Sequence, residues 1–443
     1  MAGHRHSHRR RHPGHVRCAR QSDRGRSPQA RRHRSGHGRM SDCDVVISGG
    51  GLAGATLAVA LAERGKRVAV IEATAREAES QPSYDDRTLV INAASLNILR
   101  AIGLLPAELT RMPIARIEIS RAGGFGHLCL EAANHGREHF GAVIVARELG
   151  QVLSSALENH PLIELHCPDR LTGFHTDTNS IHVELASGTR LQARLLVGAD
   201  GNASTVRQLA ALACQRHDYG ESAMIFNIQA RFAPQATAWE RFTPQGPLAL
   251  LPQSGGRLGV VWIDRHDAID QAMQWPDRQL LDTLASRLGQ DFGGLARPGR
   301  RARYPLVRQR TPWPLARRLV LVGNAANAVH PVSAQGFNLG LRDIGGLVDA
   351  LEGLDDPGQP SALAHYARLR QADQESTVRY TDTLARSFTN PSRLAGLAAG
   401  LGLAAHAGWP ALSARLAQAA MGFREPVCSL ARDPAQHSRQ VAA

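Results

Sequence analysis

The chain has 443 residues, of which 43% are apolar and 21% are charged, so it can bury a large core, and its length predicts two or three domains. Its net charge of +13 comes almost entirely from residues 1–39, where twelve arginines and one aspartate contribute +11. The rest is nearly neutral, which argues against a nucleic-acid-binding face on the folded part. The six cysteines form no C-x-x-C pair, so neither a disulfide framework nor a zinc site is indicated, and a reducing compartment is favoured.

Residues 1–41 form a basic leader of His, Arg, Gly and Ser, with too few apolar residues to build a core. A nucleic-acid-binding arm and a His-rich metal-binding tract are alternatives, but the composition favours a disordered segment without a share in the chemistry. Met40 directly precedes the first predicted strand, so we expect Met40 to be the true start. The leader lacks the apolar region of a signal peptide.

The first chemical signal is a G-x-G-x-x-G, at Gly49, Gly51 and Gly54. A predicted strand over 44–48 runs into it, a predicted helix over 55–64 follows, and a second strand over 67–71 ends at Glu72. The glycines allow a tight turn and close approach to a pyrophosphate at the helix N-terminus, and Glu72 would accept hydrogen bonds from ribose hydroxyls. Strand, helix, strand and acid together predict a dinucleotide site rather than a plain βαβ unit.

The next segments carry weaker signals. Residues 85–87 open a segment that is predicted to become an amphipathic helix, with Leu96, Leu99 and Ile102 on one face. Arg87 itself is either a surface charge or a group on the cofactor. Strands are predicted over 117–120 and 128–130. A helix predicted over 147–157 places Arg147 and Gln151 on one face, four residues apart.

Two more buried strands run into glycine turns. Residues 195–197 lead to Gly198-Ala199-Asp200-Gly201, and residues 319–322 lead to Gly323-Asn324. His330-Pro331 then interrupts the regular secondary structure, because proline fixes φ and has no N–H. Gly336 and Gly340 bracket a second predicted turn before a helix that ends near Leu351. Each turn alone could be an ordinary βα loop, but three of them favour a site where free backbone N–H groups meet a ligand.

The remaining chain divides at Tyr304. Alternating runs between 219 and 304 predict an antiparallel sheet, which either covers a pocket or is purely structural. A long polar helix is predicted after Ser361. Residues 394–414 hold four glycines and Pro410, too many helix breakers for a membrane span of ~20 residues, and core packing is favoured over a contact with a membrane surface.

The glycine turns, in this order, resemble the FAD-dependent aromatic hydroxylases, and within them the ubiquinone-biosynthesis branch. The resemblance covers residues 43–388, and its most specific pieces are Glu240-Arg241-Phe242-Thr243, residues 165–170 and residues 334–343. It implies an α/β fold with a discontinuous Rossmann-like FAD-binding domain (42–115, 138–215 and 305–360). An antiparallel-sheet substrate domain like that of p-hydroxybenzoate hydroxylase (116–137 and 216–304) would be inserted in it, and a helical region (361–443) would follow.

The resemblance also implies residue roles. Gly49, Gly51, Gly54 and Glu72 would hold the ADP half of FAD, with Leu52 and Ala53 in the same turn. Arg87, Arg147 and Gln151 would lie near the flavin and its phosphates, and Asp200 and Gly201 would serve both FAD and the nicotinamide cofactor. Asn324 would bond the ribityl chain. The isoalloxazine would be lined by Pro331, Gln335, Gly336, Phe337 and Asn338.

Two positions depart from the family pattern. Asn324 stands where the family usually has aspartate, which keeps an acceptor oxygen but removes a charge, so flavin potential or affinity would differ. Ala334 replaces the usual glycine, a modest change if φ there is negative.

The expected reaction is hydroxylation of a polyprenylated phenol, 2-polyprenyl-6-methoxyphenol, with O2 and NADPH or NADH; no catalytic residue and no metal ligand is assigned. We expect a cytoplasmic enzyme, peripheral to the inner membrane, with other ubiquinone-biosynthesis proteins as partners and no nucleic acid. The alternatives are an NAD-dependent dehydrogenase, a non-catalytic flavoprotein scaffold, and a hydroxylase of another ring position or of a soluble aromatic.

Overall fold

A computed structural model describes residues 41–75, 87–123, 126–231, 235–289, 292, 294–388, 393–423 and 425–432. The leader up to Met40 and the acidic pair Asp85 and Asp86 lie outside these residues. The predicted leader ends one residue too late, because Ser41 already belongs to strand β1 (Ser41–Asp42), which pairs with β12 (Arg190–Ala193).

A parallel sheet carries the three predicted glycine turns. Its order is β21-β13-β2-β3-β9, and the short β20 (Leu315–Ala316) pairs antiparallel at one edge. The three strands that run into the predicted turns are neighbours, so their carboxyl ends meet at one edge of the sheet. The parallel strands are β2 (Val45–Ser48), β3 (Val68–Ile71), β9 (Ile163–His166), β13 (Leu195–Gly198) and β21 (Leu319–Leu321).

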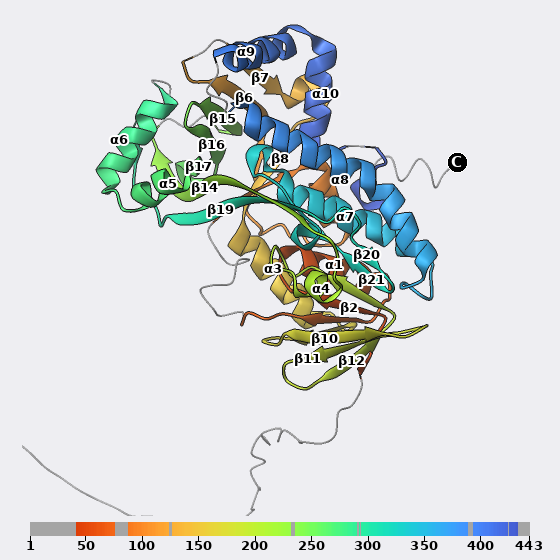
Figure 1. Cartoon of the computed structure of the whole chain (residues 1–443). Coiled ribbons are helices and arrows are strands. Elements are labelled where there is room, and N and C mark those ends of the chain that lie inside the picture. The colour runs from red at the N-terminus through yellow and green to blue at the C-terminus, as the bar shows by residue number, and fades with distance from the viewer. Residues whose placement is uncertain are drawn as a thin grey trace, which may run out of the picture. The chain divides into compact units, whose positions relative to one another are not determined.

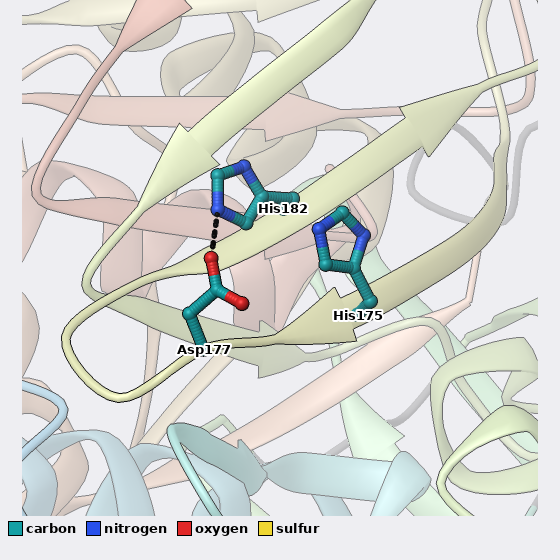
Figure 2. A group of neighbouring side chains, drawn as sticks. All are labelled: His175, Asp177 and His182. Atoms are coloured by element: carbon teal, nitrogen blue, oxygen red, sulfur yellow. Dashed lines mark hydrogen bonds and ion pairs between the residues drawn. The ribbon is translucent and has the colours of Figure 1, made fainter.

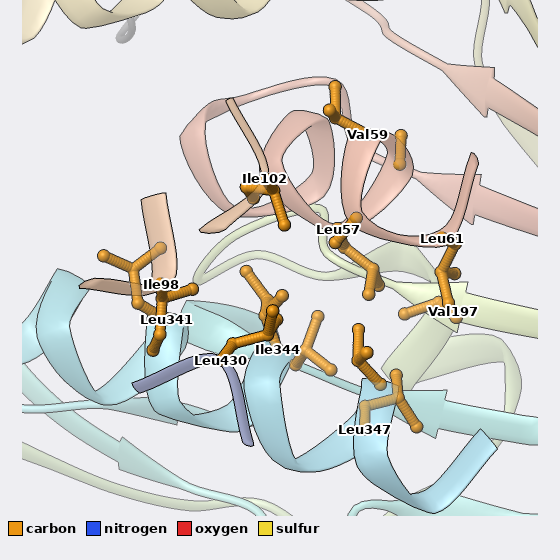
Figure 3. Packing of buried hydrophobic residues seen from close by; sticks show 14 of the residues in the cluster. Leu57, Val59, Leu61, Ile98, Ile102, Val197, Leu341, Ile344, Leu347 and Leu430 are labelled. Atoms are coloured by element: carbon orange, nitrogen blue, oxygen red, sulfur yellow. The ribbon is translucent and has the colours of Figure 1, made fainter. Parts of the chain in front are cut away.

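The main core lies between this sheet and its helices. Helix α1 (Leu52–Ala62) is apolar on all sides and nearly all buried, as expected for a helix packed between a sheet and other helices. Its Leu57 and Leu61 share one cluster with α2 (Ala93–Ala101) and α7 (Gln335–Leu351), through Ile98 and Ile344 among others (Figure 3). Helix α3 (Ala146–Asn159) packs against α1.

The predicted antiparallel sheet has nine strands. It runs β22-β19-β14-β17-β16-β15-β6-β7, with β18 paired to β14. All its pairs are antiparallel except β15 with β6. The strands are β6 (Arg116–Arg121), β7 (His127–Glu131), β14 (Gln215–Ala230), β15 (Thr237–Thr243), β16 (Gly246–Pro252), β17 (Arg257–Arg265), β18 (Leu295–Ala296), β19 (Ala302–Arg310) and β22 (Asn327–Ala328).

Two helices interrupt the segment that was expected to be all strand. Helices α5 (His266–Met273) and α6 (Asp277–Leu288) bury Ile269, Leu280 and Leu284 against the sheet. They follow β17 directly and cover the sheet face whose core includes Trp262. The helical spacing of these apolar residues is the local signal that identifies them.

Two smaller sheets complete the strands. One is β1-β12-β11-β10, with β10 (Leu171–Thr176) and β11 (Ile181–Leu185) forming a hairpin. The other is β4-β8-β5, with β4 (Thr88–Asn92), β5 (Met112–Ile114) and β8 (Gly141–Val145). The predicted helix with Leu96 and Leu99 on one face is α2, which starts at Ala93, and residues 88–92 before it pair with β8 as a strand that was not predicted. A short helix α4 (Thr205–Leu209) follows β13.

The C-terminal region is helical, as predicted. Helix α8 (Pro360–Phe388) packs along α7, α9 (Arg393–Gly408) lies against β7, and α10 (Pro410–Met421) follows and packs on α9 (Figure 1). Within the described ranges, no helix is both long enough and apolar enough to cross a membrane. The division of the chain into FAD-binding, substrate and helical domains stays a prediction.

Candidate active site

One cavity of about 1680 Å³ is lined by two kinds of surface. The first is the turn region, by which we mean residues 48–54, 199–201 and 323–324 at the ends of the parallel strands; all of these except Gly50 and Gly54 line the cavity. The second, the apolar wall, consists of the cavity-lining residues of β6, β7, β15, β16 and β17. The predicted sheet therefore covers a pocket rather than being purely structural.

Glycine is required at two points of the turn region. Gly49 has φ +105°, and a Cβ there would lie 2.5 Å from the Ala199 carbonyl oxygen. A Cβ on Gly54 would lie 1.9 Å from the Gly49 oxygen, so Gly54 supports the turn from behind rather than lining the cavity. Helix α1 begins at Gly51 without a side-chain cap, which leaves the positive end of the helix available to an anion.

Glu72 lies beside this turn and lines the cavity. Its Oε2 accepts a hydrogen bond from the Gly50 N–H (2.7 Å), and its Oε1 accepts one from the Thr74 N–H (2.8 Å). The acid at the end of the second strand thus joins the glycine turn in space, as the βαβ pattern predicts.

Asp200 supplies an unused acceptor at the next strand end. Its Oδ2 accepts from the Val206 N–H at 3.1 Å, whereas its buried Oδ1 has no partner among the described residues. Asp200 and Gly201 both line the cavity. Because buried acceptors are nearly always satisfied in native proteins, this oxygen is available to a hydrogen-bond donor of a ligand or of a water molecule in the cavity.

The start of α7 differs from the predicted turn. Gly336 and Gly340 lie inside the helix, and the turn is made one step earlier by Ser333 (φ +61°) and Ala334 (φ +50°). Alanine at 334 was expected to be a modest change only if φ there is negative. Its φ is positive, so this residue is strained where glycine would not be. Four predicted residues of this segment line the cavity: Pro331, Gln335, Gly336 and Phe337.

Asn338 plays a different part. It is buried, and its amide nitrogen donates to the Val90 oxygen (2.7 Å) and the Ala334 oxygen (2.8 Å). Its oxygen accepts from the Asn92 N–H (3.0 Å). Asn338 therefore fixes the start of α7 to β4 and does not line the cavity.

The remaining predicted residues separate into two groups. Arg87 and Asn324 line the cavity, and the Arg87 guanidinium lies 4.9 Å from the centre of the Tyr304 ring. Of the two interpretations of Arg87, the cavity group is the one that agrees with this position. Arg147 and Gln151 are exposed on α3 and do not line the cavity.

The apolar wall contains one carboxyl group that had no predicted role. Glu240 lies in the middle of β15, between Ala238 and Phe242, which also line the cavity. Burial raises the pKa of Glu240 to about 7. Sequence reasoning could include Glu240 in a family motif, but its surroundings come from distant strands and leave no local signal.

A second buried polar group lies beside the start of α7. His330 is fully buried, its Nδ1 accepts from the Val332 N–H (3.2 Å), and its Nε2 lies 3.4 Å from Glu221 Oε2. Its ring packs edge-on against Tyr219, whose hydroxyl donates to Asp382 (2.9 Å). These contacts hold the His330-Pro331 turn in place.

One group of side chains could hold a metal ion. His175, Asp177 and His182 lie on the β10–β11 hairpin, with potential ligand atoms within 4.8 Å of one another (Figure 2). The imidazoles stack at 4.5 Å, and His182 Nε2 lies 2.8 Å from Asp177 Oδ2. None of the three lines the cavity, so they take no part in its chemistry.

The cavity fits FAD. The glycine turn closes only without a Cβ, α1 offers an uncapped N-terminus for a pyrophosphate, and Asp200 keeps an acceptor for a hydroxyl group. Its volume also exceeds the roughly 300–1,000 Å³ of a site for one drug-sized ligand, so a second ligand has room beside the cofactor.

Comparison with known proteins agrees with this site. Residues 42–381 match the model of the FAD binding domain family. The ubiquinone hydroxylase UbiL of Rhodospirillum rubrum is 36% identical over 371 residues, covering 82% of this chain and 85% of the relative. The 3-demethoxyubiquinol 3-hydroxylase of Escherichia coli is 32% identical over 356 residues, covering 78% of this chain and 90% of the relative.

Solved structures show the same fold. The p-nitrophenol 4-monooxygenase PnpA of Pseudomonas putida superposes with a TM-score of 0.71, covering 87% of this chain and all of that one. At 17% identity this likeness concerns the fold alone.

Proposed function

The chain belongs to the FAD binding domain family and is an FAD-dependent monooxygenase, and we propose that it hydroxylates the ring of a polyprenylated phenol in ubiquinone biosynthesis. The specific substrate that we propose is 2-polyprenyl-6-methoxyphenol, which would become the corresponding benzoquinol. The observation that carries the proposal is that the turn region and an apolar wall line one and the same cavity. Relatives named as ubiquinone hydroxylases support the choice of pathway.

The turn region and the start of α7 would hold FAD. We assign the ADP half to Gly49, Gly51, Leu52, Ala53, Gly54 and Glu72. The Glu72 carboxylate, which accepts from the Gly50 N–H, would then accept from the ribose hydroxyls instead. Asp200 and Gly201 would bind the next part of the cofactor and Asn324 the ribityl chain. Pro331, Gln335, Gly336 and Phe337 would lie at the isoalloxazine, with Arg87 nearby and Asn338 supporting them from behind. Arg147 and Gln151 stay predictions, because they lie outside the cavity lining.

Bound FAD supplies the redox chemistry, taking electrons from NADPH or NADH and activating O2. The chain would contribute stabilisation of negative charge and exclusion of water. Helix α7 starts at the cavity without a side-chain cap, so its N-terminal N–H groups can stabilise negative charge there. The apolar wall excludes water from the reacting ring, which suppresses wasteful side reactions. Asn324 in place of the family's aspartate removes one negative charge, which should favour a reduced, anionic cofactor.

Family membership removes the NAD-dependent dehydrogenase from the alternatives. A hydroxylase of another ring position or of a soluble aromatic remains the competing function. Mass spectrometry of lipid extracts from a strain lacking this gene separates them. We expect 2-polyprenyl-6-methoxyphenol to accumulate and to disappear when the gene is restored. Accumulated unmethoxylated 2-polyprenylphenol would move the reaction to another carbon, and normal quinone in a strain without redundant hydroxylases would favour a soluble substrate.

A contact with a membrane surface would deliver such a substrate. Leu401 and Trp409 are 62% and 64% exposed, and they belong to the α9–α10 segment, other residues of which line the cavity. Exposed apolar side chains next to a lipid-sized cavity suit an interfacial helix. We expect replacement of both by Ser to reduce sedimentation with anionic lipid vesicles. Trp313, 56% exposed, is the matched control, and equal loss with Trp313→Ser would reject the contact.

A further inference from the structure

The apolar wall offers one polar side chain to a bound ring. Strand β15 pairs with β6 on one side and β16 on the other, so Glu240 lies opposite Ile119 and Ala249 in the interior of the sheet. The residues around it on neighbouring strands that line the cavity are apolar: Ile117, Ile119, Leu128, Leu130, Ala249, Leu251, Val261 and Ile263. A carboxyl group in such a wall has a cost in stability that function would explain.

The two faces of β15 have different surroundings, and Glu240 lies on the face that lines the cavity. Arg241, the next residue, donates to the Arg287 oxygen (2.9 Å) and to Ser120 Oγ (3.2 Å). Strand alternation therefore places the arginine in a hydrogen-bonded layer and the glutamate in the cavity. Within the described ranges, the Glu240 carboxyl group has no hydrogen bond and no ion pair.

The other carboxylates of the cavity each accept at least one hydrogen bond from the chain, and they lie away from the apolar wall. Glu72 accepts from two backbone N–H groups, Asp169 accepts from Arg170 and Ser187, and Asp200 accepts from Val206. All three lie with the turn region or β10 rather than with the apolar wall. Glu240 is thus the carboxyl group of the lining that faces the apolar part of the cavity.

Other titratable groups reach the cavity from neighbouring elements. They are Arg87, Arg170 before β10, Tyr304 of β19, Tyr380 and Arg386 of α8, and His406 of α9. The strands on both sides of β15 add no charged lining residue. Burial alone raises the pKa of Glu240 to about 7, so near neutral pH the group can both take up and release a proton.

We propose that the Glu240 carboxylate accepts the hydrogen bond, and then the proton, of the substrate's phenolic hydroxyl while the ring takes up oxygen. This inference rests on the proposed function and adds to it the base of the reaction. Phenol hydroxylation needs such a base because the O–H becomes much more acidic as the ring gives up electrons. A positioned base whose pKa lies near the working pH contributes about 10²–10⁴ in rate.

The phenolic O–H bond breaks, its proton moves to a Glu240 oxygen, and its electron pair enters the ring as a ring carbon forms a bond to one oxygen atom from O2. That carbon then loses its hydrogen as a proton while Glu240 returns a proton to the phenolic oxygen. The second oxygen atom leaves as water, and NADPH or NADH supplies the two electrons through the cofactor.

The first test compares variants as FAD-loaded enzymes, with 2-geranyl-6-methoxyphenol as the probe. We expect Glu240→Gln to lower the rate of hydroxylation about 100-fold or more and to abolish the rise of kcat/KM with pH near 7. Glu240→Asp should retain part of the rate and the pH-dependent rise. Flavin reduction by NADPH should change less than two-fold in both. Glu118 lies on β6 outside the cavity lining, and Glu118→Gln is the matched control.

The second test needs no turnover. In infrared difference spectra between the wild-type protein and Glu240→Gln, the protonated carboxyl band should disappear with a midpoint near pH 7. The phenol should shift this band, whereas its O-methyl ether, which has no hydroxyl to donate, should not. Hydroxylation by Glu240→Gln at the wild-type rate and pH profile, or equal shifts by phenol and ether, would overturn the role of Glu240. A phenol-specific shift without hydroxylation would instead reject the proposed substrate and leave the proton acceptor in place.

Discussion

The turn region and the apolar wall line the same cavity but are built from different chemistry. The turn region relies on backbone groups and on glycines that have no room for a Cβ, with Glu72 and Asp200 as its acids. The apolar wall relies on side chains from five strands that span residues 117 to 263. The first is determined by short, local sequence patterns, and the second only by the assembled sheet.

The strongest test of the turn region is Gly54→Ala. A Cβ at this position would lie 1.9 Å from the Gly49 oxygen, a backbone atom that cannot move without opening the turn. We expect loss of bound FAD and destabilisation by about 3 kcal/mol or more, measured by flavin absorbance and urea unfolding. Gly408→Ala, where a Cβ would meet nothing, is the control. A yellow, fully stable Gly54→Ala protein would contradict the close packing.

Ionic contacts between α7 and α8 hold these two helices together beside the cavity. Asp373 accepts from Arg342 (2.7 Å) and is paired with Arg370, which also donates to Asp343 (2.9 Å), and all four side chains are buried. Burial alone would raise the pKa of Asp373, but the two arginines lower it below its usual range. Helix α7 starts at the turn region, and α8 contributes Tyr380 to the cavity.

We therefore expect Asp373→Asn to destabilise the packing of α7 on α8, and with it the fold that surrounds the cavity. Removing one partner from a buried ionic network costs about 3–5 kcal/mol, because the remaining charges stay buried. Urea unfolding followed by flavin fluorescence and by circular dichroism should shift by the same amount. Asp282→Asn, in an exposed pair with Arg278, should shift neither. If only one probe moved, the cofactor site would unfold independently of the rest of the chain.

The apolar wall should be destabilised by its own carboxylate. A carboxyl group with a raised folded-state pKa contributes stability below its ordinary pKa, near 4.5, and this contribution is lost as pH rises towards about 7. Glu240→Gln should therefore be more stable than the wild-type protein at pH 8, by about 1–3 kcal/mol, with a smaller difference at pH 5. Urea unfolding at the two pH values measures this. An equal difference at both would mean that Glu240 does not titrate in this range.

The contrast between the turn region and the apolar wall also explains which parts of the site could be predicted from the sequence. The glycine turns, Glu72 and Asp200 are near their strands in sequence, so spacing alone places them at the ends of neighbouring parallel strands. Strand β4 was missed because its pairing with β8, about 50 residues later, decides its conformation. Glu240 received no role because the apolar residues that raise its pKa come from β6, β7, β16 and β17. Asn338 is named by its motif, but its contacts with β4 cannot be read from it.

The smallest expected effect concerns Ala334, which replaces the family's glycine in the turn before α7. Ala334 has φ +50°, a conformation that costs a non-glycine residue about 1–2 kcal/mol, whereas glycine would lose about 0.5–1 kcal/mol more entropy on folding. Ala334→Gly should therefore stabilise the protein by about 0.5–1 kcal/mol in urea unfolding. Ala73 also lines the cavity but has no positive φ, so Ala73→Gly should destabilise it slightly. Equal effects at the two positions would mean that the turn before α7 stores no strain, and that alanine there is as well suited as the family's glycine.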